Sequence, residues 1–272
     1  MTVRTSTYTI RGGVAGRERL RVLSRVIGPL TLELLERVQV PAGARCLDAG
    51  CGGGDVTLVL AGLAGAEGEV LGIDVDEVKI ALARDEADAA GVRNVEYRVS
   101  SVADVPPDGA FDVAVARFLL SHLPDPAAAL EHLAAAVRPG GVVAVQDIDY
   151  TGGFCHPPCA GFDYAWDMYP RTVHHAGGDA TVGRRLPALF AATGFADIDV
   201  AIEQPAGFAH DPKLLHVSTL ENIAEAAVAS GLAEPAEIDA AIRDLRAFAE
   251  RPDTMLTLPR IIAVSGRVPA AG

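Results

Sequence analysis

The chain has 272 residues, half of them apolar, and a formal net charge of −13. This length suits one large domain, or a domain with a cap, and supplies enough apolar material for a sizeable core. The acidic balance argues against broad affinity for nucleic acid, which depends on basic patches that neutralise phosphates. Four cysteines are too few for a disulfide scaffold in a chain of this length, so we expect reduced thiols.

The N-terminal segment is polar, and no window of the chain approaches the length of a membrane-spanning helix. We therefore expect a cytoplasmic protein without a membrane partner. "YTIRGGVAGRERL" is a candidate lid over a ligand, with Tyr8 as a contact residue, although an exposed tail explains it equally well. The stretch "GRERLRVLSRVIGPLTLELLERV" has apolar residues at helical spacing, and Gly28-Pro29 predicts a break into two helices.

From residue 44 to residue 150, short apolar runs alternate with helical patterns. Strands are expected at "ARCLDAG", "EVLGIDV", "VEYRVSS", "FDVAVARF" and "GVVAVQDID", with helices at Asp55–Leu63, Asp76–Ala90 and Pro124–Val137. Further on, the pattern predicts a helix at "RRLPALFAATGF", a strand at "DIDVAIEQ", two alanine-rich helices and a closing strand at "RIIAVSGRV". Such alternation predicts a doubly wound α/β domain with a mostly parallel sheet covered on both faces.

The first strand ends at Asp48, and glycines follow at 50, 52 and 54. A dinucleotide fingerprint starting at Gly50 would end at Asp55, an acid that repels a pyrophosphate, and a P-loop would need a Gly-Lys-Ser/Thr that is absent. An NAD-dependent oxidoreductase is therefore disfavoured. The loop suits a ligand with a positive group for Asp48 and a carboxylate for the free N–H groups of the helix start, as in an amino acid.

The second strand ends at Asp74, 26 residues after Asp48. An acid at this point of such a unit hydrogen-bonds ribose hydroxyls, although a helix cap or a solvated acid is the alternative. A ligand with an amino-acid end, a ribose and no phosphate is S-adenosylmethionine.

At this point the chain resembles the class I S-adenosylmethionine-dependent methyltransferases, and it is similar to the small-molecule group of ubiquinone and menaquinone biosynthesis. The resemblance is strong over roughly residues 40–150 and holds for the order of the final strands. It rests on four segments: "LDAGCGGGDVT", "GIDVD", "SSVADVPPDGAFDVAVARFLLSHLPDP" and "RPGGVVAVQD". It implies a seven-stranded Rossmann-like sheet of order 3-2-1-4-5-7-6 with an antiparallel last strand, together with a helical cap.

The resemblance also assigns cofactor contacts. It implies that Asp48, Gly50 and Gly52 hold the methionine end and that Asp74 binds the ribose. It further implies contacts by Val75 with adenine, by Ser101 and Val102 with the adenine edge, and by Arg117 and Phe118 near the methionine end. Ser101 departs from the family, which often has an aspartate there. A neutral serine is a weaker acceptor than a carboxylate. Three alternatives follow: Ser101 alone is enough to bind the adenine amino group, Asp104 helps to bind it, or the affinity for the cofactor is lower.

Ligands of open α/β sheets bind at the carboxyl ends of the strands, where three candidate bases follow the fourth and fifth strands. These are His122, Asp147 and Asp149. Histidine has the most suitable ordinary pKa, while packing or backbone hydrogen bonds are the alternative role for each. A neutral amine or an electron-rich carbon would need no dedicated base.

The segment "FCHPPCAGFDYAWDMYP" is the candidate substrate wall. Its candidate contacts are Phe154, His156, Tyr164, Trp166 and Tyr169, and the alternative is that these rings form the core of the cap. Cys155, His156, Cys159, His174 and His175 are spaced too loosely to predict a zinc site, so we expect no metal.

The expected organisation is a helical lid at 1–40, a cofactor-binding core at 41–150, a cap insertion at 151–190, and C-terminal strands at 191–272 with cap helices at 212–250. The predicted function is in-line methyl transfer in an enclosed pocket to a small molecule, a secondary metabolite, with S-adenosylhomocysteine as product. The alternatives are a macromolecular acceptor and a cofactor-binding protein without methyl transfer. Oxygen, nitrogen and carbon acceptors stay open, as does the oligomeric state, including a homodimer.

Overall fold

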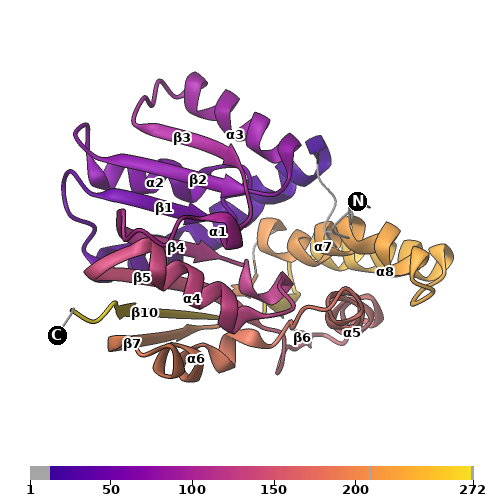
Figure 1. Ribbon diagram of the computed structural model, residues 1–272. Helices are drawn as coiled ribbons and strands as arrows, with labels where there is room; N and C mark the ends of the chain where they lie inside the picture. Colours follow the sequence, from indigo (N-terminus) through magenta and orange to yellow (C-terminus); the bar gives the residue numbers. More distant parts are fainter. Residues whose placement is uncertain (1–12, 209, 271–272) are drawn as a thin grey trace, which may run out of the picture.

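A seven-stranded sheet with helices on both faces forms the body of the molecule (Figure 1). The computed structural model describes residues 13–208 and 210–270. The strand order is β3-β2-β1-β4-β5-β10-β7, and β10 runs antiparallel to both of its neighbours. The strands are β1 (Arg45–Ala49), β2 (Glu69–Asp74), β3 (Val95–Val99), β4 (Phe111–Arg117), β5 (Val137–Asp149), β7 (Ala196–Glu203) and β10 (Arg260–Arg267). The predicted fold class, strand order and reversed last strand are confirmed.

Five helices of the described chain cover the two faces of this sheet. One face carries α1 (Gly13–Val38), α2 (Asp55–Ala64) and α3 (Glu77–Ala89), and the other carries α4 (Pro126–Ala136) and α6 (Leu186–Thr193). Local chemistry sets several of their ends. The Asp76 carboxylate accepts hydrogen bonds from the first N–H groups of α3, and Gly194 ends α6 in the left-handed conformation at φ 91°.

The predicted break at Gly28-Pro29 is wrong, because α1 is one continuous helix with Pro29 inside it. Proline removes one helical hydrogen bond and crowds the preceding turn, at a cost of about 3 kcal/mol. Ile27, Thr31 and Leu34, on either side of this proline, are at most 3% exposed. Burial of this face against the sheet and the cap offsets the local cost, so tertiary packing overrides the sequence rule.

A helical cap stands at the carboxyl ends of the parallel strands (Figure 1). It consists of α5 (Ala160–His175), α7 (His210–Ala229) and α8 (Pro235–Glu250), which pack on one another, and α1 also contacts α7. A three-stranded sheet that the sequence pattern did not predict joins the cap to the core. Its strands are β6 (Cys155–His156), β9 (Met255–Thr257) and β8 (Ala206–Gly207). Within the described ranges, no helix combines the length and apolar composition needed to cross a membrane.

Leu34→Ala tests whether the buried face of α1 holds this helix. Leu34 is fully buried and Leu32, on the same helix, is 40% exposed. Truncating Leu34 should lower the free energy of unfolding by about 2–5 kcal/mol, whereas Leu32→Ala should cost less than about 1 kcal/mol. Urea denaturation of both variants measures the difference, and equal losses would contradict the packing described for α1.

Candidate functional site

The glycine loop between β1 and α2 is fastened to the end of β2. The N–H groups of Gly50 and Cys51 both donate to the carbonyl oxygen of Ile73, each at 2.8 Å. Gly50, Gly52 and Gly54 all have positive φ, between 54° and 84°, which glycine adopts without strain. A Cβ atom on Gly54 would lie 2.5 Å from the hydroxyl of Tyr97. The loop therefore needs glycine both for its backbone angles and for space.

Asp74 joins this loop to the start of α3. Its Oδ2 accepts from the N–H of Gly52 at 3.0 Å, and its Oδ1 accepts from the N–H of Asp76 at 2.9 Å. A carboxylate oxygen can accept two hydrogen bonds, so each oxygen keeps capacity for a ligand hydroxyl. Val75, the next residue, is 49% exposed and offers apolar surface beside it. This arrangement suits a ribose with an attached base.

Asp48 lies beneath the loop and is 1% exposed. Burial raises the pKa of its carboxyl to about 7, although the hydroxyl of Thr57, which donates to Oδ2 at 2.6 Å, opposes the rise. The charge of Asp55 adds to the rise. A cationic group on the loop would favour the ionised form of this carboxyl.

A partly buried polar chain runs from the loop to α1 and β5. Arg117, at the end of β4, pairs with Asp55 at the start of α2, with 2.5 Å between Nη2 and Oδ2. Its Nη1 lies 3.4 Å from the hydroxyl oxygen of Thr31 on α1, and that hydroxyl donates to Oε1 of Gln146 at 2.7 Å. Phe118 follows Arg117 with φ 54°, and its N–H donates to the Gln146 carbonyl at 2.8 Å. Such unusual backbone angles gather at functional sites.

The charges around the loop decide which ligand fits. Asp48, Asp55 and Asp74 supply three carboxylates, and Arg117 is held by one of them. This set suits a ligand with a cationic group and free hydroxyls better than one with phosphates. S-adenosylmethionine fits, because it carries an ammonium, a sulfonium and two ribose hydroxyls.

Comparison with known proteins agrees with this geometry. The sequence model of a family described as "Methyltransferase domain" matches residues 41–179, about half of the chain. The chain belongs to this methyltransferase family. S-adenosylmethionine is its methyl donor, and the expected cofactor is confirmed.

Among curated relatives, the ubiquinone biosynthesis O-methyltransferase of Xanthomonas axonopodis pv. citri (strain 306) is 33% identical over 151 residues. The match covers 55% of this chain and 62% of the relative, so the chain spans less than two thirds of that relative's length.

Two solved structures share the fold. Phosphoethanolamine N-methyltransferase 2 of Haemonchus contortus, in complex with S-adenosyl-L-methionine, superposes with a TM-score of 0.53 at 18% identity, covering 93% of this chain and 52% of that one. The [4+2]-cyclase SpnF gives a TM-score of 0.56 at 22% identity, covering 89% and 81%. At these identities the likeness shows the fold alone, and the cyclase illustrates that one fold hosts different chemistries.

The residues predicted for the adenine end are positioned by a short helix, η1 (Val102–Asp104). The hydroxyl of Ser101 accepts from the N–H of Ala103 at 3.2 Å and so caps this helix, and the Val102 side chain is 8% exposed within the core. Both lie beyond the end of β3, next to β2. Their contact with adenine stays a prediction. Tyr8 lies outside the described residues.

The three candidate bases lie in different surroundings. His122 is half-buried in the short helix η2 (Leu120–His122), which follows β4. Asp147 is fully buried and accepts from the N–H of Ser121 at 3.0 Å, so it fastens η2. Burial raises the pKa of its carboxyl to about 6. Asp149 is paired with Arg184 at 2.7 Å and with Arg260 at 3.4 Å.

These contacts indicate structural roles for Asp147 and Asp149. Both side chains lie on the face of β5 that is turned away from α1. Side chains alternate along a strand, and Gln146 faces α1 through Thr31. His122 is half-buried on the short helix η2, which follows β4. Its role as a base stays a prediction.

Two rings of the predicted substrate wall, Trp166 and Tyr169, lie in the core of the cap. Tyr150 lies 4.5 Å from Trp166 and 4.7 Å from Tyr169 between ring centroids, and Phe162 stacks on Trp166 at 5.3 Å. These rings cover one another's faces, which favours the alternative reading for Trp166 and Tyr169.

Of the other members of this wall, Tyr164 also packs against the core of the cap, whereas Phe154 and His156 are exposed. Phe154 is 54% exposed, His156 is exposed in β6, and Tyr164 is half-buried on α5.

The cysteines and histidines of this segment do not come together at one site in the structure. Cys159 precedes α5 and His174 lies in its last turn, about 20 Å along a helix of this length. Among the side chains that the structure describes, no three of His, Cys, Asp and Glu gather as metal ligands would.

Sequence reasoning missed His216, Thr31 and Gln146. His216 is 2% exposed, and its Nε2 lies 3.0 Å from the Thr257 carbonyl, which can only accept. The Nε2 therefore carries the hydrogen, and Nδ1 faces the Tyr150 hydroxyl at 3.4 Å. Burial lowers the pKa of His216 to about 4. The sequence does contain a signal for Gln146, because this polar residue directly follows the apolar run "VVAV" near the end of a predicted strand.

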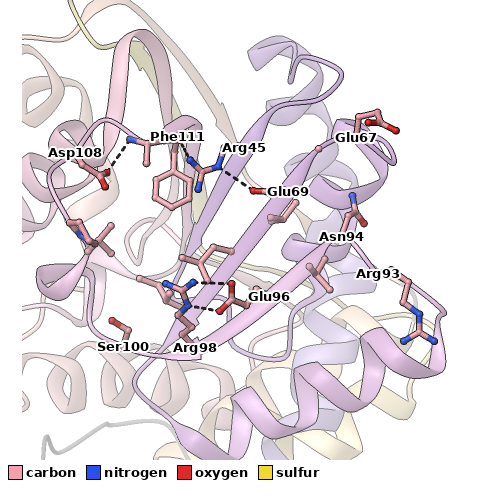
Figure 2. Close-up of a pocket in the computed structure, with 18 of the residues that line it drawn as sticks. Arg45, Glu67, Glu69, Arg93, Asn94, Glu96, Arg98, Ser100, Asp108 and Phe111 are labelled. Atoms are coloured by element: carbon pink, nitrogen blue, oxygen red, sulfur yellow. Dashed lines mark hydrogen bonds and ion pairs between the residues drawn. The ribbon is translucent and has the colours of Figure 1, made fainter.

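A separate groove of about 730 Å³ lies over β2 and β3 (Figure 2). It lies on the face of the sheet that carries α4. On this face the connection between β3 and β4 contains only the short helix η1, which is too short to cover the strands. Arg45 pairs with Glu69 and Arg98 pairs with Glu96 across its wall, as the dashed lines show. Arg93 pairs with Asp88. Each of these arginines is paired with a carboxylate, so none of the three offers an uncompensated charge to an anion.

Asp48→Asn tests the burial of this carboxyl. Its pKa is about 7 in the folded protein and 3.8 in the reference state, so the folded state keeps a proton that the unfolded state releases between these values. Stability should therefore fall as pH rises from about 4 to 7 and stay reduced above that. Relative to the wild type, Asp48→Asn should gain roughly 2–3 kcal/mol between pH 5 and pH 8.

Urea denaturation of both proteins at the two pH values measures this gain. Asp147, whose pKa is also raised, is present in both proteins, so its contribution cancels in the comparison. A difference between variant and wild type that does not change with pH would contradict the raised pKa of Asp48.

Proposed function

We propose that this protein transfers the methyl group of S-adenosylmethionine to a small-molecule acceptor of secondary metabolism, in a pocket between the strand ends and the cap. The observation that carries the proposal is the loop clamped by Asp74, with three carboxylates beneath and beside it. The helical cap above the same strand ends supports a small acceptor enclosed by protein (Figure 1). The net charge of −13 and the name of the curated relatives support a small molecule over a nucleic acid.

The chain's own residues would bind and orient the reactants. Asp74 would accept hydrogen bonds from the ribose hydroxyls, Val75 would pack on the adenine, and Asp48 would balance the ammonium. Arg117, already held by Asp55, would lie beside the methionine carboxylate. When bound, the cofactor supplies a methyl group on a positively charged sulfur, which is a good leaving group.

Much of the rate enhancement would then come from proximity and from a dry site. His122 would be the group that takes a proton from an acidic acceptor, because its ordinary pKa lies near neutrality. Within this scheme residues 1–40 act as a lid and 41–150 hold the cofactor. The cap insertion at 151–190 and the helices at 212–250, inserted in 191–272, enclose the acceptor, and the enzyme works in the cytoplasm.

Asp74→Ala tests the cofactor site directly. Its matched control is Asp85→Ala, an exposed acid on the neighbouring helix α3. Calorimetric titration should show S-adenosylmethionine and S-adenosylhomocysteine, but not NAD, binding to the wild type and to the control. Affinity should fall at least about tenfold in Asp74→Ala, because two ribose hydrogen bonds to a carboxylate are lost. Equal affinity in both variants would remove Asp74 from the site.

Methyl transfer itself is tested with labelled S-adenosylmethionine and a panel of catechols, hydroxyquinones and amines. We expect label in at least one small acceptor and none in bulk RNA or DNA. Binding of the cofactor without transfer to any member of the panel would favour a cofactor-binding protein that does not methylate, and transfer to RNA or protein would favour the macromolecular alternative.

A further inference from the structure

Gln146 is a nearly buried polar side chain at the reacting end of the sheet. It lies on β5 opposite Arg117 of β4, and it is 1% exposed. Its Oε1 accepts from the hydroxyl of Thr31 at 2.7 Å, and Thr31 is itself 3% exposed. The contact joins the lid helix α1 to the central strand of the site.

The direction of donation along this chain fixes how the carboxamide is turned. An arginine can only donate, so Nη1 of Arg117 donates to the oxygen of Thr31 at 3.4 Å. The single hydroxyl hydrogen of Thr31 is then given to Gln146 at the shorter of its two acceptor distances, 2.7 Å against 3.3 Å to the Ile27 carbonyl. The oxygen of the carboxamide therefore points to Thr31, and its NH₂ group points elsewhere.

This NH₂ group has hydrogens to give. Among the side chains and backbone groups that the structure describes, none accepts a hydrogen bond from Nε2 of Gln146. Gln146 as a residue is 1% exposed, but its Nε2 is not among the described side-chain atoms that are both fully buried and unpaired, so this atom borders open space that a ligand atom can occupy. The group to be expected there is an acceptor, such as an oxygen.

Gln146 also lies between the two halves of the site. On one side, Arg117 and Asp55 connect it to the start of α2 and the glycine loop. On the other side, Ile148 and Tyr150 continue the same face of β5 into the core of the cap, and Phe118 packs against that core. A methyl group carried on the loop would leave it in this direction.

Building on the proposed function, we propose that Gln146 is a specificity residue whose Nε2–H donates to the acceptor's reacting oxygen, and that the acceptor is a phenol or an enol. As the acceptor ionises, its proton passes to His122 and the N–H group stabilises the oxyanion. A lone pair of that oxygen forms the new C–O bond while the C–S bond breaks and its electron pair goes to sulfur. An amine would become positively charged, and an N–H donor would oppose that charge.

The test uses 4-nitrocatechol, whose ionisation is visible by absorbance, added to the complex with S-adenosylhomocysteine. In the wild type, the first pKa of the bound probe should fall by about one unit relative to free probe, because a hydrogen bond to the charged form favours it. In Gln146→Met, which keeps the length of the side chain but has no N–H, the fall should vanish and the probe should bind about tenfold more weakly.

Two further measurements separate this role from a structural one. The affinity of Gln146→Met for S-adenosylhomocysteine, measured by calorimetry, should stay within about twofold of the wild type. Thr31→Val keeps the NH₂ group but frees the carboxamide to turn, so its loss of probe affinity should be intermediate.

An unchanged probe pKa in Gln146→Met, or no binding of the probe to the wild-type complex, would overturn the proposal. A parallel loss of S-adenosylhomocysteine in Gln146→Met would also overturn it, since Gln146 would then only hold α1 against the sheet. Failure of the wild type to bind S-adenosylhomocysteine at all would instead sink the proposed function, so the two failures are distinct.

Discussion

The clamp that holds the glycine loop against the end of β2 is the constraint on which the site depends. Three loop N–H groups are used in it: those of Gly50 and Cys51 reach the Ile73 carbonyl, and that of Gly52 reaches the Asp74 carboxylate. The tightly bent loop has positive φ angles at three alternate residues, Gly50, Gly52 and Gly54. It also leaves Asp74 with one free hydrogen-bonding capacity on each oxygen, so the carboxylate that shapes the loop can still accept from a ligand hydroxyl.

The electrostatics of the site follow from this geometry. A loop fastened so closely puts Asp48 in the interior, where the pKa of its carboxyl rises and the ionised form needs a nearby cation. Arg117 forms an ion pair with Asp55 and a hydrogen bond with Thr31. Its positive charge is therefore compensated and does not make the loop a phosphate-binding site. The same arginine joins the loop to Thr31 of α1, whose hydroxyl donates to Gln146, so one polar chain runs from the glycine loop to β5.

Local pattern predicted most of the sheet, because the inner strands β1, β2, β4 and β5 contain apolar runs that are followed by a polar residue. It failed where distant packing outweighed local preference. Pro29 stays inside α1 because Ile27, Thr31 and Leu34 are buried on both sides of it, and β6, β8 and β9 are too short for a periodic signal. The candidate site shows the same difference between local and distant signals. Asp74, Asp147 and Asp149 all stand at the end of a strand, so the sequence does not distinguish them. In the structure, Asp147 accepts from the N–H of Ser121 and Asp149 pairs with Arg184.

The sequence by itself determined the fold class, the strand order implied by the resemblance, and the kind of ligand that the loop accepts. These depend on residues close together in the chain, such as Asp48 and the three glycines, whose spacing carries the chemistry. Only the tertiary structure decided which polar side chains have free hydrogen-bonding groups. Thr31, Arg117 and Gln146 come from a helix and two strands, and their contact arises only when the sheet closes beneath α1.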